Sequence, residues 1–282
     1  MVTTFQLQPN GHLVCLGQHA NMSQASAELP SGAYTTFRTY EGSRVLRLGQ
    51  HVRRLEESLA LMGCPAALDV AVVQRGIAEA IQHMAYPESR FRLTFAPPNL
   101  YISIEPFHPY PASLYETGVW CVTVPLRRDN PHAKSTAFIS AASSAYQSLP
   151  SGAHEGLMIA EDGAILEGLS SNFFAILDEA MPEGNARPVL YTEAERVLLG
   201  VTRALVLEVA AEVVQIVERA PHLSDAPRFK EAFITSVSRE ILPVTRIDQT
   251  VIGEGVPGGI TRELIARFRS LVEREARSVF EP

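Results

Sequence analysis

Lysine is nearly absent from this sequence of 282 residues. Of its 24 basic residues only Lys134 and Lys230 are lysine, so arginine carries almost all of the positive charge. Cysteine is scarce too: the three cysteines lie far apart and form no C-x-x-C pair. That pattern argues against a disulfide framework or a zinc knuckle and favours the reducing cytoplasm. The eight histidines include no H-E-x-x-H, so no metal site is expected.

Long apolar stretches and net positive charge are also missing. No run approaches the roughly 18 apolar residues that a membrane-spanning helix needs, and the N-terminal residues do not resemble a signal peptide. The formal net charge of −7 argues against nucleic acid or an anionic membrane as the main partner. Hydrophobic residues nevertheless make up 46% of the chain, which predicts a protein with a substantial core.

Apolar periodicity predicts a mixture of strands and helices without a regular βαβ rhythm, which is typical of the α+β class. In the first part of the chain we expect strands at 32–40 and 44–48, helices at 50–63 and 69–85, and a hairpin at 91–95 and 100–107. Further on we expect a strand at 119–126, two strands within 154–168 around the turn at 161–163, and strands at 172–177 and 231–237. Helices are expected after Lys134, at 200–213 and at 261–279.

The stretch 106–118 carries three prolines in a polar run and is the best linker candidate. It divides the chain into two predicted domains, a small N-terminal α+β domain at 1–112 and a larger C-terminal domain at 118–282.

The stretch IGEGVPGG at 252–259 matches the G-x-G-x-x-G pattern of dinucleotide-binding turns. Such a turn requires a βαβ unit, and only 24 residues follow Gly258, which is enough for one helix and no second strand. We therefore interpret it as a glycine-rich turn.

Lys134, in PHAKSTAF, is the strongest candidate for chemistry. Arginine cannot lose its proton at working pH, whereas a buried lysine can, and only a neutral amine attacks a carbonyl. Composition bias toward arginine, with Lys134 on the surface, is the alternative interpretation.

Four further stretches carry groups suited to an anionic aromatic ligand that contains nitrogen. Arg54 in HVRRL is expected at the start of a helix, where it could bind a phosphate. The helix start at GVTR, with Thr202, could bind phosphate through its free N–H groups. The hydroxyls of TSVS at 235–238 are possible further donors. Glu167 at a strand end could hold a pyridine nitrogen protonated. Each of these signals also fits an ordinary cap, turn or solvated face.

The order and spacing of these motifs resemble the class IV, or fold type IV, family of enzymes that use pyridoxal 5′-phosphate. The resemblance covers roughly residues 31–269, and EGLSSNFFAI and SREILPV are its most specific stretches. This family includes branched-chain and D-amino acid aminotransferases, (R)-selective amine transaminases and aminodeoxychorismate lyases. The resemblance implies a two-lobed fold with a small N-terminal lobe and a larger C-terminal lobe that is β-barrel-like with helices. It also implies a homodimer.

The resemblance also implies roles for individual residues. Lys134 corresponds to the lysine that forms the Schiff base with the cofactor, and Glu167 to the carboxylate at the pyridine nitrogen. The other implied cofactor contacts are the phosphate-binding Arg54, the helix-start pair Val201 and Thr202, the stretch Ser236, Val237 and Ser238, and the active-site Tyr34. Val237 stands where several relatives have threonine, so Ser238 could take that role.

The substrate is less well defined by the sequence. Arg38 and Arg92, together with Arg90, are candidates for binding a substrate carboxylate, and surface charge is the alternative interpretation for all three. The stretch YTTFR replaces the signature of branched-chain enzymes, and its TTxR pattern resembles aminodeoxychorismate lyases, in which a threonine assists the elimination of pyruvate. We therefore predict an aminotransferase acting on an amino acid or amine and a 2-oxo acid. The alternatives are a lyase that uses Thr35 or Thr36 and an inactive binding protein with the same fold.

Overall fold

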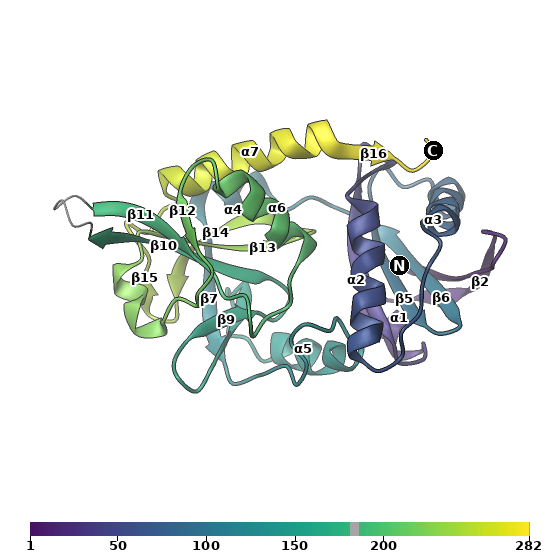
Figure 1. Ribbon diagram of the computed structural model, residues 1–282, viewed down its shortest axis with the longest axis horizontal. Helices are drawn as coiled ribbons and strands as arrows, with labels where there is room; N and C mark the ends of the chain where they lie inside the picture. Colours follow the sequence, from purple (N-terminus) through teal and green to yellow (C-terminus); the bar gives the residue numbers. More distant parts are fainter. Residues whose placement is uncertain (181–185, 282) are drawn as a thin grey trace. The chain divides into compact units, whose positions relative to one another are not determined.

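The chain folds into two units, each built around its own β-sheet. The structure is a computed structural model that describes residues 1–180 and 186–281 (Figure 1). The first unit comprises Met1–Pro109, His132–Ser140 and Val272–Pro282, and the second comprises Tyr110–Pro131 and Ala141–Leu271. The contiguous domains predicted at 1–112 and 118–282 stay a prediction.

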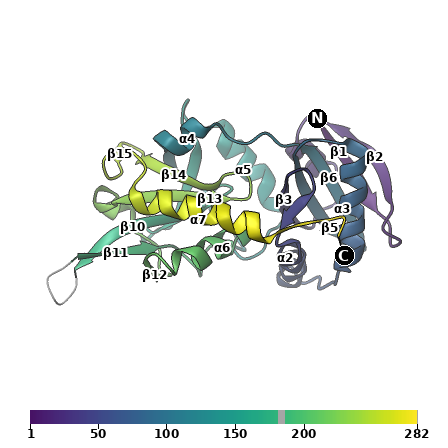
Figure 2. The same cartoon turned by 90° about the horizontal axis from the view of Figure 1, so that it is seen from above.

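The first unit contains a seven-stranded sheet in the order β16-β4-β3-β5-β6-β1-β2, in which every neighbouring pair is antiparallel. Figure 2 shows β1, β2 and β6 at one end of this sheet. The strands are β1 (Val2–Leu7), β2 (Leu13–His19), β3 (Ala33–Tyr40), β4 (Arg44–Leu46), β5 (Ser89–Ala96), β6 (Asn99–Pro106) and β16 (Ala276–Ser278).

Helices α1 (Met22–Ala27), α2 (Leu48–Leu61) and α3 (Val70–Met84) pack against this sheet. Helix α2 contacts β3, and α3 contacts β2 and β6. The inward face of α2 includes Val52, Leu55 and Leu59, each at most 1% exposed. Their spacing of three and four residues is that of an amphipathic helix on a core.

The second unit contains a nine-stranded sheet that closes on itself. Strands β7, β8, β9, β10, β13 and β14 form a six-stranded barrel, because β14 pairs with β7 and β9 pairs with β10. Strands β11 and β12 extend the sheet beyond β10, and β15 extends it beyond β14. The strands are β7 (Val119–Val124), β8 (Glu155–Ile159), β9 (Ile165–Gly168), β10 (Asn172–Ala180), β11 (Ala186–Tyr191), β12 (Gln215–Val217), β13 (Glu231–Ser236), β14 (Glu240–Ile247) and β15 (Thr250–Val251).

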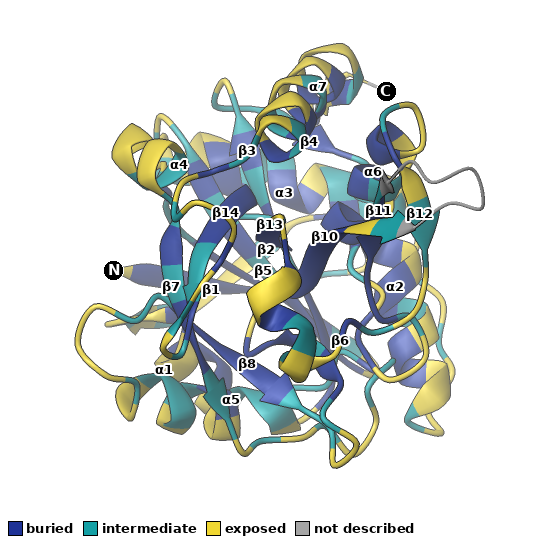
Figure 3. Cartoon of the chain, turned by 90° about the vertical axis from the view of Figure 1, so that its left-hand side faces the viewer, coloured by how far each residue is buried: buried dark blue, intermediate teal, exposed yellow. Residues whose placement is uncertain are grey.

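The barrel strands supply most of the apolar core of the second unit, including Leu157, Phe173, Ile234 and Leu242. Figure 3 shows the barrel strands as mostly buried, while α7 buries one side only. The remaining helices of the described residues are α4 (Ala112–Thr117), α5 (Ala137–Gln147), α6 (Val201–Ala210), the 3₁₀ helix η1 (Leu223–Arg228) and α7 (Gly259–Glu275). None of the described helices is long and apolar enough to cross a membrane.

Several predicted boundaries were wrong. The strand expected at 44–48 ends at Leu46, because Arg47 adopts a left-handed conformation (φ 52°) and α2 begins at Leu48. Arg54 therefore lies in the interior of α2 and not at its start. The closing helix ends at Glu275, and the next three residues pair with β4 as strand β16. The predicted linker at 106–118 contains the short helix α4.

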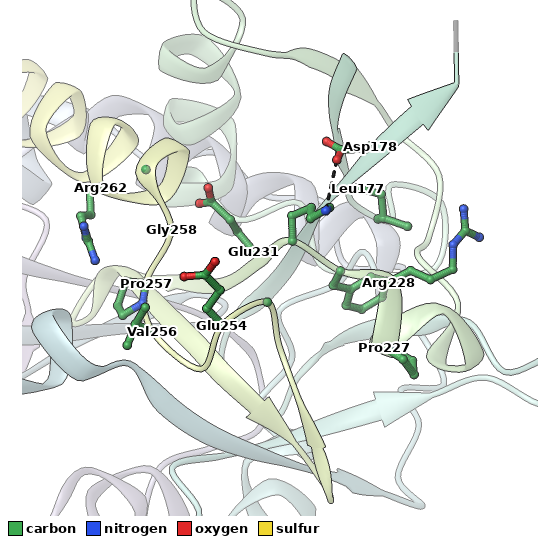
Figure 4. Close-up of a pocket in the computed structure, with 14 residues that line it drawn as sticks. Leu177, Asp178, Pro227, Arg228, Glu231, Glu254, Val256, Pro257, Gly258 and Arg262 are labelled. Carbon is green, nitrogen blue, oxygen red and sulfur yellow. Dashed lines mark ion pairs between the residues drawn. The ribbon is translucent and has the colours of Figure 1, made fainter. Parts of the chain in front are cut away.

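The glycine-rich stretch at 252–259 is a turn, as predicted, and the chain's own carboxylate occupies the helix end that follows it. Glu231 accepts hydrogen bonds from the amides of Ile260 and Thr261, at 3.0 and 2.6 Å, at the start of α7. An added Cβ on Gly258 would lie 2.1 Å from Glu231 Cδ, so glycine is needed for this approach. Figure 4 shows Glu231 and Glu254 among the residues that line the pocket of about 810 Å³ beside this turn.

Replacing Glu231 with alanine is expected to lower the free energy of unfolding by about 1–2 kcal/mol, because two amides at the positive end of α7 lose their acceptor. Urea unfolding followed by circular dichroism measures the change. Glu254→Ala removes a carboxylate of the same pocket that is exposed, and it serves as the matched control. Equal losses in the two variants would contradict the capping role.

Candidate active site

Lys134 lies in the first unit, in the loop before α5, and hydrogen bonds fix its backbone from both sides. Its amide donates to Ser58 Oγ at 3.1 Å, and its carbonyl accepts from the Tyr34 amide at 2.8 Å. Two residues later, the amide of Thr136 donates to the Gly32 carbonyl at 2.9 Å, and Thr136 Oγ1 accepts from the Gly32 amide at 3.0 Å. The loop is therefore held against the beginning of β3.

The ring of Tyr34 contacts two cationic side chains. Lys134 Nζ lies 4.7 Å from the ring centroid, and Arg92 Cζ lies 5.0 Å from it. Tyr34 is only 8% exposed, so both cations lie against an aromatic surface that is shielded from solvent. Arg92 also donates to the Met22 carbonyl at 3.0 Å and to Ser26 Oγ at 2.6 Å, and burial lowers the pKa of its guanidinium.

Arg54 is the first member of a buried chain of hydrogen bonds. Its Nη2 donates to Thr35 Oγ1 at 2.7 Å, and the same oxygen lies 3.0 Å from Nδ1 of His51. Arginine can only donate, so the Thr35 hydroxyl accepts from Arg54 and can give its own proton to a neutral His51. Burial, followed by the charges of Arg54 and Lys134, holds the pKa of His51 well below its usual value. The imidazole is therefore neutral at pH 7.

The candidate substrate residues share one face of the first sheet. Thr36 and Arg38 alternate with Thr35 along β3, and Thr36 lies opposite Arg92 in the register with β5. Thr35 points to the other face, where α2 supplies Arg54. Arg38 Cζ stacks 4.1 Å from the ring centroid of Tyr40. Thus the structure brings Tyr34, Thr36, Arg38 and Arg92 to one face and directs Thr35 away from it.

Glu167 lies in the second unit, on β9, where three donors surround its carboxylate. Oε1 accepts from Arg128 Nε at 2.8 Å, and Oε2 accepts from the Leu198 amide at 3.2 Å and from Asn172 Nδ2 at 3.4 Å. The side chains of Glu167 and Arg128 are 3% and 5% exposed. The pair lines a cavity of about 400 Å³ in the same unit.

The N-terminus of α6 is also in the second unit and begins at Val201 and Thr202. Its N-cap is Gly200, and within the described chain no side chain caps this end. The first amides of a helix have no acceptor inside the helix, so this end can bind an anion. An added Cβ on Gly200 would approach Asn172 Oδ1 to 2.5 Å, and Asn172 also donates to the Leu198 carbonyl at 2.7 Å. Asn172 thus connects the Glu167 carboxylate with the start of α6.

Ser236, Val237 and Ser238 form the end of β13 and the turn that follows it. The amide of Arg239 donates to Ser236 Oγ at 3.3 Å. Arg239 is itself held in the barrel, with Nη1 3.1 Å from Oε2 of the fully buried Glu155. Burial opposes the charge of Arg239, but the Glu155 carboxylate outweighs it and raises the arginine's pKa. The turn is therefore held to the barrel by a buried ion pair.

Sequence reasoning missed His51, Arg128 and Asn172. His51 is the first residue of H-x-x-R-L, Arg128 is the second of two adjacent arginines, and Asn172 closes EGLSSN. All three residues lie in or next to the motifs, but the sequence does not show which side chains they contact. Among residues 1–180 and 186–281, no three side chains of histidine, cysteine, aspartate or glutamate gather as metal ligands.

Comparisons with known proteins identify relatives over parts of the chain. A D-alanine aminotransferase of Bacillus licheniformis is 33% identical over 131 residues, which cover 45% of this chain and 43% of the relative. A branched-chain-amino-acid aminotransferase of Pseudomonas aeruginosa is 32% identical over 138 residues, covering 48% and 42%. In each case the matched region spans less than half the length of the relative.

Solved structures show the same fold over nearly the whole chain. The branched-chain amino acid aminotransferase of Escherichia coli has a TM-score of 0.73 at 20% identity, covering 96% of this chain and 93% of its own. The branched-chain aminotransferase of Thermoproteus uzoniensis with norvaline has a TM-score of 0.77 at 21% identity, covering 98% of this chain and 99% of its own. The predicted fold type IV architecture is confirmed.

The family model for amino-transferase class IV matches residues 32–247, which include Lys134 and most of both sheets. The resemblance inferred from the motifs is therefore confirmed, and the chain belongs to the class IV aminotransferase family.

Proposed function

We propose that this chain binds pyridoxal 5′-phosphate through Lys134 and transfers amino groups between an amino acid and a 2-oxo acid. The observation that carries the proposal is the placement of Lys134 in the first unit. One of only two lysines is fixed by its backbone, directed to a buried tyrosine ring and placed near a neutral histidine. The names of the curated relatives support amino transfer with an amino acid as donor.

The residues present fit the cofactor. A phosphate needs fixed donors, and the buried Arg54 and the uncapped N-terminus of α6 at Val201 and Thr202 are of that kind. A pyridine nitrogen needs a carboxylate, and Glu167 is a buried one. We assign the turn Ser236–Ser238 to the phosphate as well, and the ring of Tyr34 to the cofactor.

When bound, the cofactor supplies an electron sink that makes the Cα–H bond of an amino acid acidic. Lys134 Nζ binds the cofactor and, as a free amine, accepts and returns the Cα proton. Arg54 holds the phosphate, and the Thr35 hydroxyl orients the Arg54 guanidinium from the side of His51. Glu167 holds the ring nitrogen in one orientation. Arg38, Thr36 and Arg92 stay our proposed contacts for the substrate, because they share the sheet face of Tyr34.

A lyase that releases pyruvate is the second candidate, and the pattern Thr35-Thr36-Phe37-Arg38 favours it. The hydroxyl of Thr35 is engaged by Arg54 and His51, so Thr36 is the threonine we assign to such a reaction. Release of pyruvate from aminodeoxychorismate without an amino acceptor would identify the lyase. A cytoplasmic location and a homodimer stay predictions.

Lys134→Ala is expected to abolish covalent attachment of the cofactor and amino transfer, because no other residue supplies the amine. The purified protein is incubated with pyridoxal 5′-phosphate, reduced with borohydride, digested and analysed by mass spectrometry. Transfer from D-alanine or L-leucine to 2-oxoglutarate is measured in parallel. Lys230→Ala, which removes the only other lysine, is the matched control and should behave as wild type. Label on Lys230, or none in the wild type, would refute the proposal, and label without transfer would indicate the inactive alternative.

Arg54→Met is expected to weaken binding of the cofactor roughly 10- to 100-fold, since a hydrogen bond to a charged group contributes about 1.5–3 kcal/mol. Equilibrium dialysis measures the dissociation constant, and circular dichroism checks the fold. Arg53→Met makes the same change at an exposed neighbouring position and should leave the affinity unchanged. Similar affinities in both variants would remove Arg54 from the phosphate site.

Acid is expected to destabilise the fold through His51. Its pKa is lower in the folded protein than in the unfolded chain, so the unfolded chain binds the extra proton. The contribution of the neutral His51 to the free energy of unfolding is fully present above about pH 6.5. It is lost as the pH falls, by up to about 1.4 kcal/mol per pH unit. His51→Gln should reduce this loss between pH 7.5 and 5.5 in urea unfolding experiments, whereas a substitution of the exposed His108 should not. Parallel pH profiles for wild type and His51→Gln would be the contrary result.

A further inference from the structure

Arg128 and Glu167 form one of the most deeply buried ion pairs of the second unit. Their side chains are 5% and 3% exposed, and Arg128 Nε lies 2.8 Å from Glu167 Oε1. The neighbouring Arg127 also pairs with a carboxylate, that of Glu161, but these side chains are 54% and 84% exposed. Two adjacent arginines therefore make ion pairs of the same chemistry in opposite environments.

Burial changes what a carboxylate does with a proton. A carboxylate away from water and without a cation becomes neutral by taking up a proton. A guanidinium stays charged in such an environment, and its charge keeps the carboxylate ionised. The donors to Oε2, the Leu198 amide and the Asn172 side chain, are uncharged, so among the hydrogen bonds described above Arg128 alone supplies a compensating positive charge.

We propose that Arg128 is a positioning residue that keeps Glu167 ionised and thereby keeps a proton on the ring nitrogen of the bound cofactor. This inference rests on the proposed function, in which Glu167 is the partner of that nitrogen. A neutral Glu167 would retain the proton on its own oxygen and leave the nitrogen as a neutral pyridine. The cofactor would still bind, but it would draw electrons from the substrate less strongly.

Arg128→His tests the proposal, because an imidazole gains and loses its charge between about pH 5 and 8. The protein is loaded with pyridoxal 5′-phosphate that carries ¹⁵N in the ring, and the ¹⁵N resonance distinguishes pyridinium from pyridine. We expect the resonance of Arg128→His to move from the pyridinium to the pyridine position as the pH rises from 5.5 to 8.5. Wild type and the matched control Arg127→His should remain at the pyridinium position.

A second variant, Arg128→Gln, has no charge at any pH and should show the pyridine position throughout. A pyridinium resonance over the whole range in Arg128→His or Arg128→Gln would overturn the inference while leaving the proposed function intact. If Arg128→Gln does not fold, Arg128→His can be prepared at pH 5.5, where its imidazole is charged. The movement of its ¹⁵N resonance as the pH is raised then tests the inference alone. A wild-type protein that retains no cofactor would refute the proposed function itself.

Discussion

The hydrogen bond from the Tyr34 amide to the Lys134 carbonyl holds the Lys134 loop against β3, and the placement of the Lys134 side chain depends on it. A lysine side chain has four rotatable bonds, and its ammonium is placed only if its backbone is fixed first. Here the backbone is fixed by β3, and the same strand presents the Tyr34 ring to Nζ and the Thr35 hydroxyl to α2. Because side chains alternate along a strand, the neighbouring residues Tyr34 and Thr35 project to opposite faces of the sheet.

The barrel of the second unit imposes a corresponding constraint. Closure of the barrel pairs β9 with β10, so the ends of β9, β10 and β13 stay at fixed positions within that unit. Buried polar groups at these ends are engaged with one another: Glu167 with Arg128, Asn172 with Leu198, and Glu155 with Arg239. These contacts connect the strand ends to neighbouring segments of the same unit and limit the movement of the side chains there.

Much of the fold could be predicted from periodicity, because long amphipathic segments such as α2 and α3 leave little choice. Strand β14 was not predicted, and it contains Pro243, a residue type that is rare in central strands. The structure accommodates it because pairing of β7 with β14 begins only at Val244, beyond the missing N–H. The site motifs were recognisable as a pattern, yet the partners of Arg54 and Glu167 were not. Thr35 and Arg128 lie 19 and 39 residues from the side chains they contact, and sequence periodicity does not report such contacts.

The capping of α7 by Glu231 has a consequence for selectivity among anions. The N-terminal ends of α6 and α7 both attract anions, since the first amides of each helix lie in a positive potential. At α7 the carboxylate is tethered to β13, so its effective concentration at those amides is on the order of millimolar or higher, with no entropy of association left to lose. Glu231 therefore acts as a resident competitor, and a free anion must displace it there. At α6 the N-cap is Gly200, and no side chain of the described residues caps that end.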